Sequence, residues 1–343
     1  MRKILEIQKQ LLPDLTEVLK KRYTILHQVM MVGLVGRRSL ATSLNMTERV
    51  LRAETDLLKS QGLLEIESTG MKVSEAGKQL LDELEPIIQE LLGLSNLEER
   101  IRTFYKLRQV IVVPGDSDIS IMAKQELGRA GAKALLSVIR EDDVVAVTGG
   151  FTLAEVAEQL SPSIPAPLKN AWFVPARGGL GESMEFQANS IASTMAKRVG
   201  AQYRLLHIPD LLREDAYELL YQDQNIREIV GLIRKARIIM HGIGDAMEMV
   251  RRRRLEPEAA EEIHAAGAVA ESFGHYFNEQ GETVHQMLTM GLQLDDISKA
   301  EVVIGIAGGR SKAKSIHAVL KFGQEDILVI DEAAAREIVK ELD

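Results

Sequence analysis

Apolar and polar residues are distributed differently in the two parts of the chain. From about residue 110 onward, short and mostly apolar runs recur, with helix-length stretches between most of them. The runs occupy residues 110–114, 144–148, 171–175, 203–206, 238–241, 302–306 and 327–330. Strands that alternate with helices predict an α/β domain with a mostly parallel sheet covered by helices on both faces.

Residues 36–59 have a pattern that predicts a helix-turn-helix. A first helix is expected over residues 38–44, and Thr47 is placed to cap a second helix that reaches Ser60. At 3.6 residues per turn, the second helix separates an apolar face from a basic one. The apolar face is expected to carry Val50, Leu51, Leu57 and Leu58. The basic face is available for phosphates and base edges.

The flanking segments complete the pattern of a winged-helix domain. Strand-like runs at residues 63–67 and 71–73 predict a β-hairpin, and Ser74 is placed to cap a helix whose apolar stripe ends at Leu91. Helical spacing also precedes the helix-turn-helix, in residues 1–20, where Pro13 interrupts it, and in residues 23–32. This order of elements predicts DNA binding. The residues expected to contact DNA are Arg37, Arg38, Thr47, Arg49, Arg52, Lys59 and Lys72.

The distribution of charge supports this prediction. The whole chain carries a formal net charge of −8, which by itself argues against a nucleic-acid ligand. Residues 1–62, however, contain eleven Lys and Arg against six Asp and Glu, whereas residues 111–343 contain 25 against 35. A basic head on an acidic body is the asymmetry expected of a DNA-binding protein with a separate sensor domain.

Composition narrows the class of protein further. The length of 343 residues suits about two domains, and the 45% of apolar residues is enough for packed cores. The absence of cysteine excludes disulfides and thiolate metal sites, and the histidines lack the spacing of a zinc site. The N-terminus lacks the core of a signal peptide, and the chain has no run of about 18 uncharged apolar residues. A cytoplasmic protein without a membrane anchor is expected.

Four of the predicted strands are followed by loops rich in Gly and in anion-binding residues. Ligands of parallel α/β sheets bind outside the carboxyl ends of the strands. The loops are TGGFT at 148–152, PARGGLG at 175–181, HGIGD at 241–245, whose helix leads to four arginines at 251–254, and AGGRSK at 307–312. Backbone N–H groups at helix starts, together with Arg, Lys and hydroxyl groups, suit phosphates. The four loops together predict a ligand with two anionic groups.

The helix-turn-helix and the motifs VTGG, FVPARGGLGE, HGIG, MGLQLDD and AGGRSK resemble the SorC-type family of sugar-sensing transcriptional repressors. The resemblance extends over nearly the whole chain. It implies a winged-helix head and an effector domain similar to the phosphosugar isomerases. It also implies repression of an operon for the triose part of glycolysis, relieved by fructose-1,6-bisphosphate, without a cofactor.

The resemblance also implies roles for individual residues. One phosphate would contact Gly149, Gly150, Thr152, Arg177 and Gln187. The other would contact Arg252, Gly309, Arg310, Ser311 and Lys312, with Glu271 near the sugar hydroxyls. Phe151 departs from the family pattern because a hydroxyl residue is expected there, so one hydrogen bond to phosphate is lost. Arg310 stands where a small residue is usual, and it either adds a charge contact or narrows the pocket.

Two other functions are compatible with the sequence. An enzyme of the sugar-phosphate isomerase type would use Glu271 or Asp245 as its base, although no acid–base pair is evident from spacing. Alternatively, the body only oligomerises, which the Gly-rich and Arg-bearing loops disfavour. From the residues alone, Glu271 and Asp295–Asp296 are candidates for binding sugar hydroxyls or a metal.

The prediction that combines these observations has three parts. Residues 1–93 form the winged helix-turn-helix domain with its coupling helix, residues 94–109 form a linker helix, and residues 110–343 form the phosphosugar-binding and oligomerisation domain. The protein is expected to be a repressor and not an enzyme, without a bound metal. Its expected partners are operator double-stranded DNA, a phosphorylated sugar and further copies of itself, in a dimer or tetramer.

Overall fold

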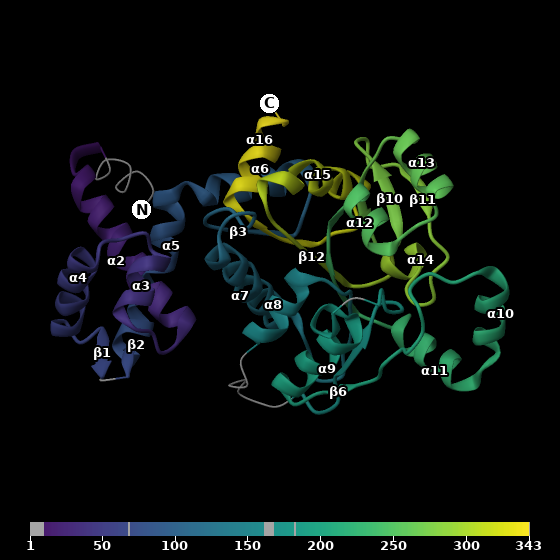
Figure 1. Ribbon diagram of the computed structural model, residues 1–343, viewed down its shortest axis with the longest axis horizontal. Coiled ribbons are helices and arrows are strands. Elements are labelled where there is room, and N and C mark those ends of the chain that lie inside the picture. Colours follow the sequence, from purple (N-terminus) through teal and green to yellow (C-terminus); the bar gives the residue numbers. More distant parts are fainter. Residues whose placement is uncertain (1–9, 68, 161–167, 182, 343) are drawn as a thin grey trace. The chain divides into compact units, whose positions relative to one another are not determined.

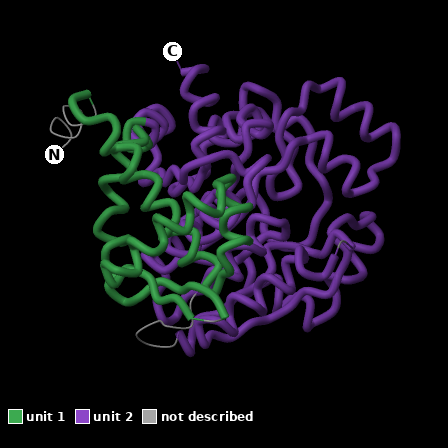
Figure 2. The backbone as a smooth tube through the Cα atoms, turned by 60° about the vertical axis from the view of Figure 1, so that its left-hand side comes forward, with its two compact units in different colours: residues 1–96 green, residues 97–343 purple. Residues whose placement is uncertain are grey.

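The computed structural model describes residues 10–67, 69–160, 168–181 and 183–342. The chain divides into two compact units, Met1–Asn96 and Leu97–Asp343, which we call the head and the body (Figures 1 and 2). Among the helices in the described ranges, none combines the length and the apolar character that a membrane span needs.

The head has the helices and the hairpin expected of a winged helix-turn-helix domain. They are α2 (Pro13–Val32), α3 (Arg37–Ser43), α4 (Glu48–Ser60), β1 (Leu64–Glu67), β2 (Gly70–Val73) and α5 (Glu75–Leu92). Residues 10 and 11 are helical, Leu12 is not, and Pro13 begins α2, so the predicted interruption is present. Proline suits the first helical position, because that position needs no N–H and proline has a fixed φ. Residues 1–9 of the first predicted segment lie outside the described residues.

In α4, the predicted N-cap is present, and the buried face agrees in part with the predicted apolar face. The Thr47 hydroxyl accepts a hydrogen bond from the backbone N–H of Val50 at 3.4 Å, which confirms the predicted N-cap of α4. On α4, Leu51, Thr55 and Leu58 form the buried stripe at i, i+4 and i+7. The assignment of Val50 to the apolar face was wrong. Its side chain is 44% exposed, because it lies one residue, or about 100°, away from Leu51 around the helix.

The body contains the predicted parallel sheet, with seven strands among the described residues. In spatial order they are β3 (Gln109–Val113), β13 (Ile327–Asp331), β12 (Val302–Ala307), β7 (Ile238–Gly242), β4 (Val144–Val147), β5 (Trp172–Pro175) and β6 (Gln202–Tyr203). Every neighbouring pair is parallel. The carboxyl ends of these strands therefore lie at one edge, where the four Gly-rich loops begin.

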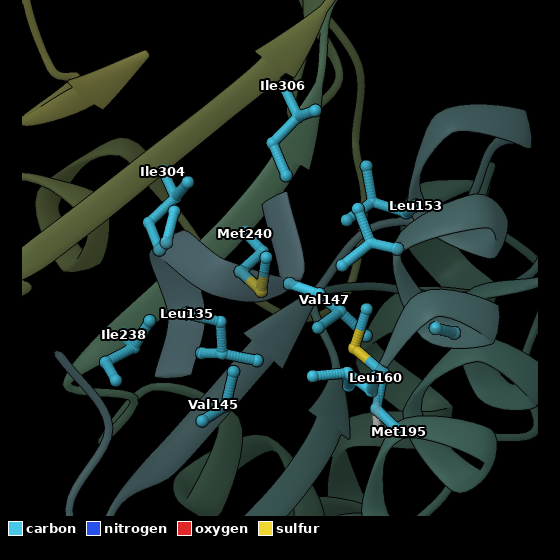
Figure 3. Packing of buried hydrophobic residues seen from close by; sticks show 14 of the residues in the cluster. Leu135, Val145, Val147, Leu153, Leu160, Met195, Ile238, Met240, Ile304 and Ile306 are labelled. Atoms are coloured by element: carbon cyan, nitrogen blue, oxygen red, sulfur yellow. The ribbon is translucent and has the colours of Figure 1, made fainter. Parts of the chain in front are cut away.

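Alternate residues of the strands pack against helices on opposite faces of the sheet. Figure 3 shows Val145, Val147, Ile238 and Met240 of the face that packs against Leu135, Leu153 and Met195. These three residues belong to α7 (Ile121–Val138), α8 (Phe151–Gln159) and α9 (Ala188–Val199). On the opposite face, Ala146 and Ile239 pack in a core with α10 (Glu214–Gln222) and α11 (Gln224–Ile233). The period of two follows from strand geometry.

A second, antiparallel sheet was not predicted. It is formed by β8 (Gly244–Asp245), β9 (Ala268–Ser272), β10 (His275–Asn278) and β11 (Thr283–Gln286). Its strands are short, interrupted by glycine turns, and they carry Glu271 and His275 where buried apolar residues would be expected. The division between the two units falls within α6 (Leu94–Tyr105). The remaining elements of the body are η1 (Met184–Phe186), α12 (Ala246–Arg253), α13 (Pro257–Ala265), α14 (Leu294–Ile297), η2 (Arg310–Lys312), α15 (Ala313–Phe322) and α16 (Glu332–Lys340).

Candidate functional site

A cavity of about 170 Å³ opens beyond the carboxyl ends of β4, β5 and β7. Residues from the loops that follow these strands line it, together with residues of α12, of β9 and of the loop after β12. The predicted effector-binding residues that line it are Gly149, Gly150, Thr152, Arg177, Gln187, Arg252, Glu271 and Lys312. The position agrees with the general location of ligand sites in parallel α/β sheets.

The loop after β4 requires glycine at two adjacent positions. A Cβ atom at Gly149 would lie 2.7 Å from the carbonyl oxygen of Phe186, so the backbones are too close for a side chain. Gly150 has φ +123°, which glycine adopts easily, and it is the N-cap of α8. The first N–H groups of α8 have no partner within the helix and are therefore suited to an anion in the cavity.

Arg177 is held by two carboxylates at the wall of the cavity. Its Nε lies 3.1 Å from Oδ1 of Asp210, and its Nη2 lies 3.4 Å from Oε1 of Glu271. Only about 10% of the side chain is exposed, and within the described residues its Nη1 has no hydrogen-bond partner. A guanidinium with a buried donor to spare is prepared to bind an anionic group that enters the cavity.

Arg253 contacts the same two carboxylates. Its Nε donates to Asp210 at 3.1 Å, its Nη2 donates to Glu271 at 2.9 Å, and its Nη1 donates to the hydroxyl of Tyr276 at 3.2 Å. Only 1% of its side chain is exposed. Two arginines and two carboxylates therefore form one buried network, which fixes the position of the Arg177 side chain.

The network controls the ionisation of Glu271 and of its neighbour His275. Burial alone would raise the pKa of Glu271, but the positive charges of Arg253 and Arg177 outweigh it and lower the pKa to about 2. Burial lowers the pKa of His275 to about 4, against the opposing effect of the Glu271 carboxylate and together with a smaller contribution from Arg177. At neutral pH, Glu271 is therefore charged and His275 is neutral.

The stability of the body is expected to fall as the pH is lowered below about 6.5. The unfolded chain binds a proton at His275 near pH 6.5 and at Glu271 near pH 4.5, whereas the folded chain does so only near 4 and 2. The unfolded state therefore gains protons first, so stability is lost from pH 6.5 to 4 through His275 and from 4.5 to 2 through Glu271. Urea unfolding followed by the fluorescence of Trp172, the single tryptophan, reports on the body. In His275→Gln, the decline between pH 6.5 and 4.5 should become shallower; an unchanged slope would contradict this assignment.

The fourth Gly-rich loop is only partly at the cavity. Lys312 lines it, whereas Gly309, Arg310 and Ser311 do not. The Arg310 side chain is 68% exposed and lies 3.7 Å from Glu337, so it points away from the cavity. Ser311 lines a neighbouring cavity of about 280 Å³, which shares Phe151, Thr152, Glu248 and Lys312 with the first.

The structure thus brings together eight of the eleven residues that were expected to bind the effector. It also adds Arg253 and Asp210, which the sequence analysis did not single out. A signal for Arg253 was present, because Ala246, Met249, Val250 and Arg253 share one helical face, which is buried. Asp210 lies in an irregular segment after β6, and its pattern gives no comparable signal.

The predicted DNA-contacting residues lie on α3, α4 and the wing, and most are paired with acids on the same surface. Arg37 lies 3.1 Å from Asp56, Arg38 lies 3.2 Å from Glu48, and Arg52 lies 3.8 Å from Asp56. Lys72 lies 3.0 Å from both Glu65 and Glu67, and these carboxylates raise its pKa. In the described part of the head, Arg49 and Lys59 are exposed and form no ion pair.

Comparisons with known proteins agree with this two-part organisation. Residues 18–88 match the family model described as "CggR N-terminal DNA binding domain", and residues 89–340 match the one described as "Putative sugar-binding domain". A DNA-binding head and a sugar-binding body define the class of sugar-responsive transcription regulators.

Two relatives that match over nearly their whole length narrow the class to a family. The central glycolytic genes regulators of Priestia megaterium and Bacillus subtilis are 45% and 41% identical to this chain, with at least 99% of each chain covered. The chain belongs to the SorC-type family of sugar-sensing transcription regulators, in the group of the central glycolytic genes regulators.

Two solved structures support the fold. A SorC family regulator from Enterococcus faecalis matches 71% of this chain and 99% of its own, with 38% identity and a TM-score of 0.67. The full-length sorbitol operon regulator SorC from Klebsiella pneumoniae matches 89% and 94%, with 17% identity and a TM-score of 0.68, which supports the fold alone.

Proposed function

We propose that the protein represses a glycolytic operon by binding operator DNA and that fructose-1,6-bisphosphate, or a related bisphosphorylated sugar, relieves the repression. The observation that carries the proposal is the convergence of Arg177, Arg252 and Lys312 on one cavity from three separate elements. Three cations and the N–H groups of the Gly149–Gly150 loop are suited to a ligand with two anionic groups. The names of the two glycolytic relatives favour a glycolytic sugar as that ligand.

The arrangement favours distinct roles for the two ends of the ligand. One phosphate binds at Gly149, Gly150 and Thr152 with Arg177 and Gln187, and the other binds between Arg252 and Lys312. Glu271 accepts hydrogen bonds from sugar hydroxyls, because its carboxylate stays charged at neutral pH. The protein acts as a homo-oligomer whose heads bind two half-sites.

The same geometry argues against an isomerase. A general base works best when its pKa lies near the working pH, whereas the pKa of Glu271 is lowered to about 2. The other nominated base, Asp245, accepts a hydrogen bond from the N–H of Glu248 at 2.8 Å and caps α12. Each carboxylate therefore has a binding or structural role that does not require proton transfer.

The proposal is tested by measuring the effect of fructose-1,6-bisphosphate on thermal stability and on binding to operator DNA selected from random duplexes. A ligand at 100 times its dissociation constant stabilises by about 2.7 kcal/mol. By linkage, the sugar should weaken operator binding and DNA should weaken sugar binding by the same factor, commonly about 5–150-fold. In Arg252→Ala, the affinity for the sugar is expected to fall roughly 10- to 100-fold, since one charge-assisted contact is lost, with operator binding kept.

Arg49→Ala is the matched control in the other domain. Arg49 lies on the exposed face of α4, and its removal should weaken operator binding and reduce the salt dependence, while the thermal response to the sugar stays as in the wild type. A normal sugar response in Arg252→Ala, or turnover of phosphosugars by the purified protein, would refute the proposed role of the cavity.

A further inference from the structure

The loop between β3 and α7 places two carboxylates on the fourth Gly-rich loop. Oδ2 of Asp118 accepts a hydrogen bond from the backbone N–H of Ser311 at 2.8 Å, and its Oδ1 accepts one from the Ser311 hydroxyl at 3.0 Å. Oδ1 of Asp116 accepts one from the N–H of Arg310 at 3.4 Å and another from the N–H of Asp118 at 3.0 Å. The two loops are therefore joined through groups that would otherwise bind an external anion.

The successive backbone N–H groups of Gly309, Arg310 and Ser311 each donate to a carboxylate. The N–H of Gly309 donates to Asp331 at 2.6 Å, and Asp331, which is fully buried, also accepts from the N–H groups of Ser117 and Ala334. Asp331 is thus a permanent part of the fold. Asp118 differs, because its hydrogen bonds to Ser311 are exposed to solvent and can be exchanged for others.

The fit between Asp118 and the loop is close. A Cβ atom at Gly309 would lie 2.2 Å from Oδ1 of Asp118, so glycine at this position lets the carboxylate reach the loop. Gly309 also has φ +102°, a backbone conformation that side chains other than glycine rarely adopt. The carboxylate therefore occupies the place that a Gly-Gly loop at a helix start offers to a phosphate oxygen.

Lys312 connects this contact to the effector cavity. Its side chain lines both the effector cavity and the neighbouring cavity in which Asp118 and Ser311 lie. A phosphoryl group bound at Lys312 would lie beside the Asp118 carboxylate. The negative charges of the phosphoryl group and of the Asp118 carboxylate would repel each other there, so the carboxylate is expected to leave the Ser311 donors.

We propose that Asp118 is a built-in competitor that occupies the Ser311 donors in the unliganded protein and is displaced by a phosphoryl group of the effector. The proposal rests on the proposed function, because it concerns the second phosphate of the same ligand. Arrival of the effector exchanges an internal carboxylate for an external phosphate, and it frees the loop between β3 and α7 from the loop after β12. Only molecules in which Asp118 has left the Ser311 donors can bind the second phosphate there. The apparent affinity for the effector is therefore the intrinsic affinity multiplied by the fraction of such molecules.

The test compares Asp118→Ala and Asp118→Asn with Glu155→Gln, using titration calorimetry with fructose-1,6-bisphosphate and separately with inorganic phosphate. Glu155 lines the same cavity as Asp118, and in the described residues no hydrogen bond joins it to the loop. Glu155→Gln and Asp118→Asn therefore remove the same charge, but only Asp118→Asn removes a charged competitor for the Ser311 donors. Asp118→Ala should bind both ligands about three- to tenfold more tightly than the wild type, with Asp118→Asn in between and Glu155→Gln little changed.

Two results would overturn the proposal. Equal tightening in all three variants would show a general effect of charge, and unchanged or weaker binding in Asp118→Ala would show that Asp118 supports the bound state. If the wild type bound no phosphosugar, the proposed function would fail, whereas tighter binding of inorganic phosphate by Asp118→Ala would still support the competitor role. Hydrogen exchange of residues 115–120 gives a second measurement, with faster exchange expected on saturation by the bisphosphate and unchanged exchange counting against displacement.

Discussion

Replacement of Arg253 by alanine is expected to destabilise the body by about 3–5 kcal/mol, since it leaves the buried carboxylates of Asp210 and Glu271 with one arginine, Arg177, in place of two. Its guanidinium donates to Asp210, Glu271 and Tyr276, and its side chain is 1% exposed. Removal of one partner of a buried ion pair costs far more than the pair contributes, because the remaining charge stays out of water. Urea unfolding monitored by Trp172 fluorescence measures the loss.

The neighbouring arginine provides the control for this prediction. Arg251 also lies in the last turn of α12, but its side chain faces solvent. Arg251→Ala should change the free energy of unfolding by no more than about 0.5 kcal/mol. A similar loss in both variants would mean that the helix end, and not the buried network, is responsible. Any protein that retains its fold in Arg253→Ala should also bind the effector less tightly, since Arg177 loses its fixed position.

The second large effect is expected for Gly291→Ala, with a loss of about 2–4 kcal/mol. Gly291 forms a β-bridge with Arg177 and has φ +141°. A Cβ atom at this position would lie 2.2 Å from the carbonyl oxygen of Ala176 and 2.9 Å from Cα of Arg177. Backbone atoms would have to move to admit the methyl group, and the Arg177 side chain would move with them. Thermal unfolding and effector titration should therefore both be affected.

Gly231→Ala is the matched substitution at a position without crowding. Gly231 lies within α11, and no atom would lie within 4 Å of an added Cβ. Because glycine weakens a helix interior, this variant should be more stable by about 0.5–1 kcal/mol. If Gly291→Ala lost no stability or effector affinity relative to the wild type, the close approach at Arg177 would not constrain the site.

The main sheet and the head could be predicted because their signals are local. Runs such as Val144–Val147 and Val302–Ala307 are buried on both faces, so nearly every residue is apolar, and Thr47 marks the start of α4 by its own chemistry. The second sheet lacked such a signal. Its strand β9 buries Glu271, whose charge is compensated by residues distant in the sequence.

The loops that form the site were predicted, but the hydrogen bonds and ion pairs within it were not. Arg177 and Lys312 were predicted among the effector-binding residues because each lies in a loop that follows a predicted strand, and Glu271 because the resemblance to the family implied it. No sequence pattern indicated that Asp210 and Arg253 hold Arg177 or that Asp118 occupies the loop at Ser311. Such contacts join residues that are far apart in the chain, and they depend on tertiary geometry that no local pattern encodes.

The pairing of cations with acids on the head has a consequence for the way in which the protein searches a genome. Arg37, Arg38, Arg52 and Lys72 each lie beside a carboxylate, so a random duplex must compete with internal partners for these four cations. Non-specific affinity comes almost entirely from such phosphate contacts. Residence on random DNA is therefore expected to be shorter than it would be without these acids. Long residence then requires a sequence whose base contacts offset the exchange of ion pairs, which sharpens the distinction between an operator and the rest of the chromosome.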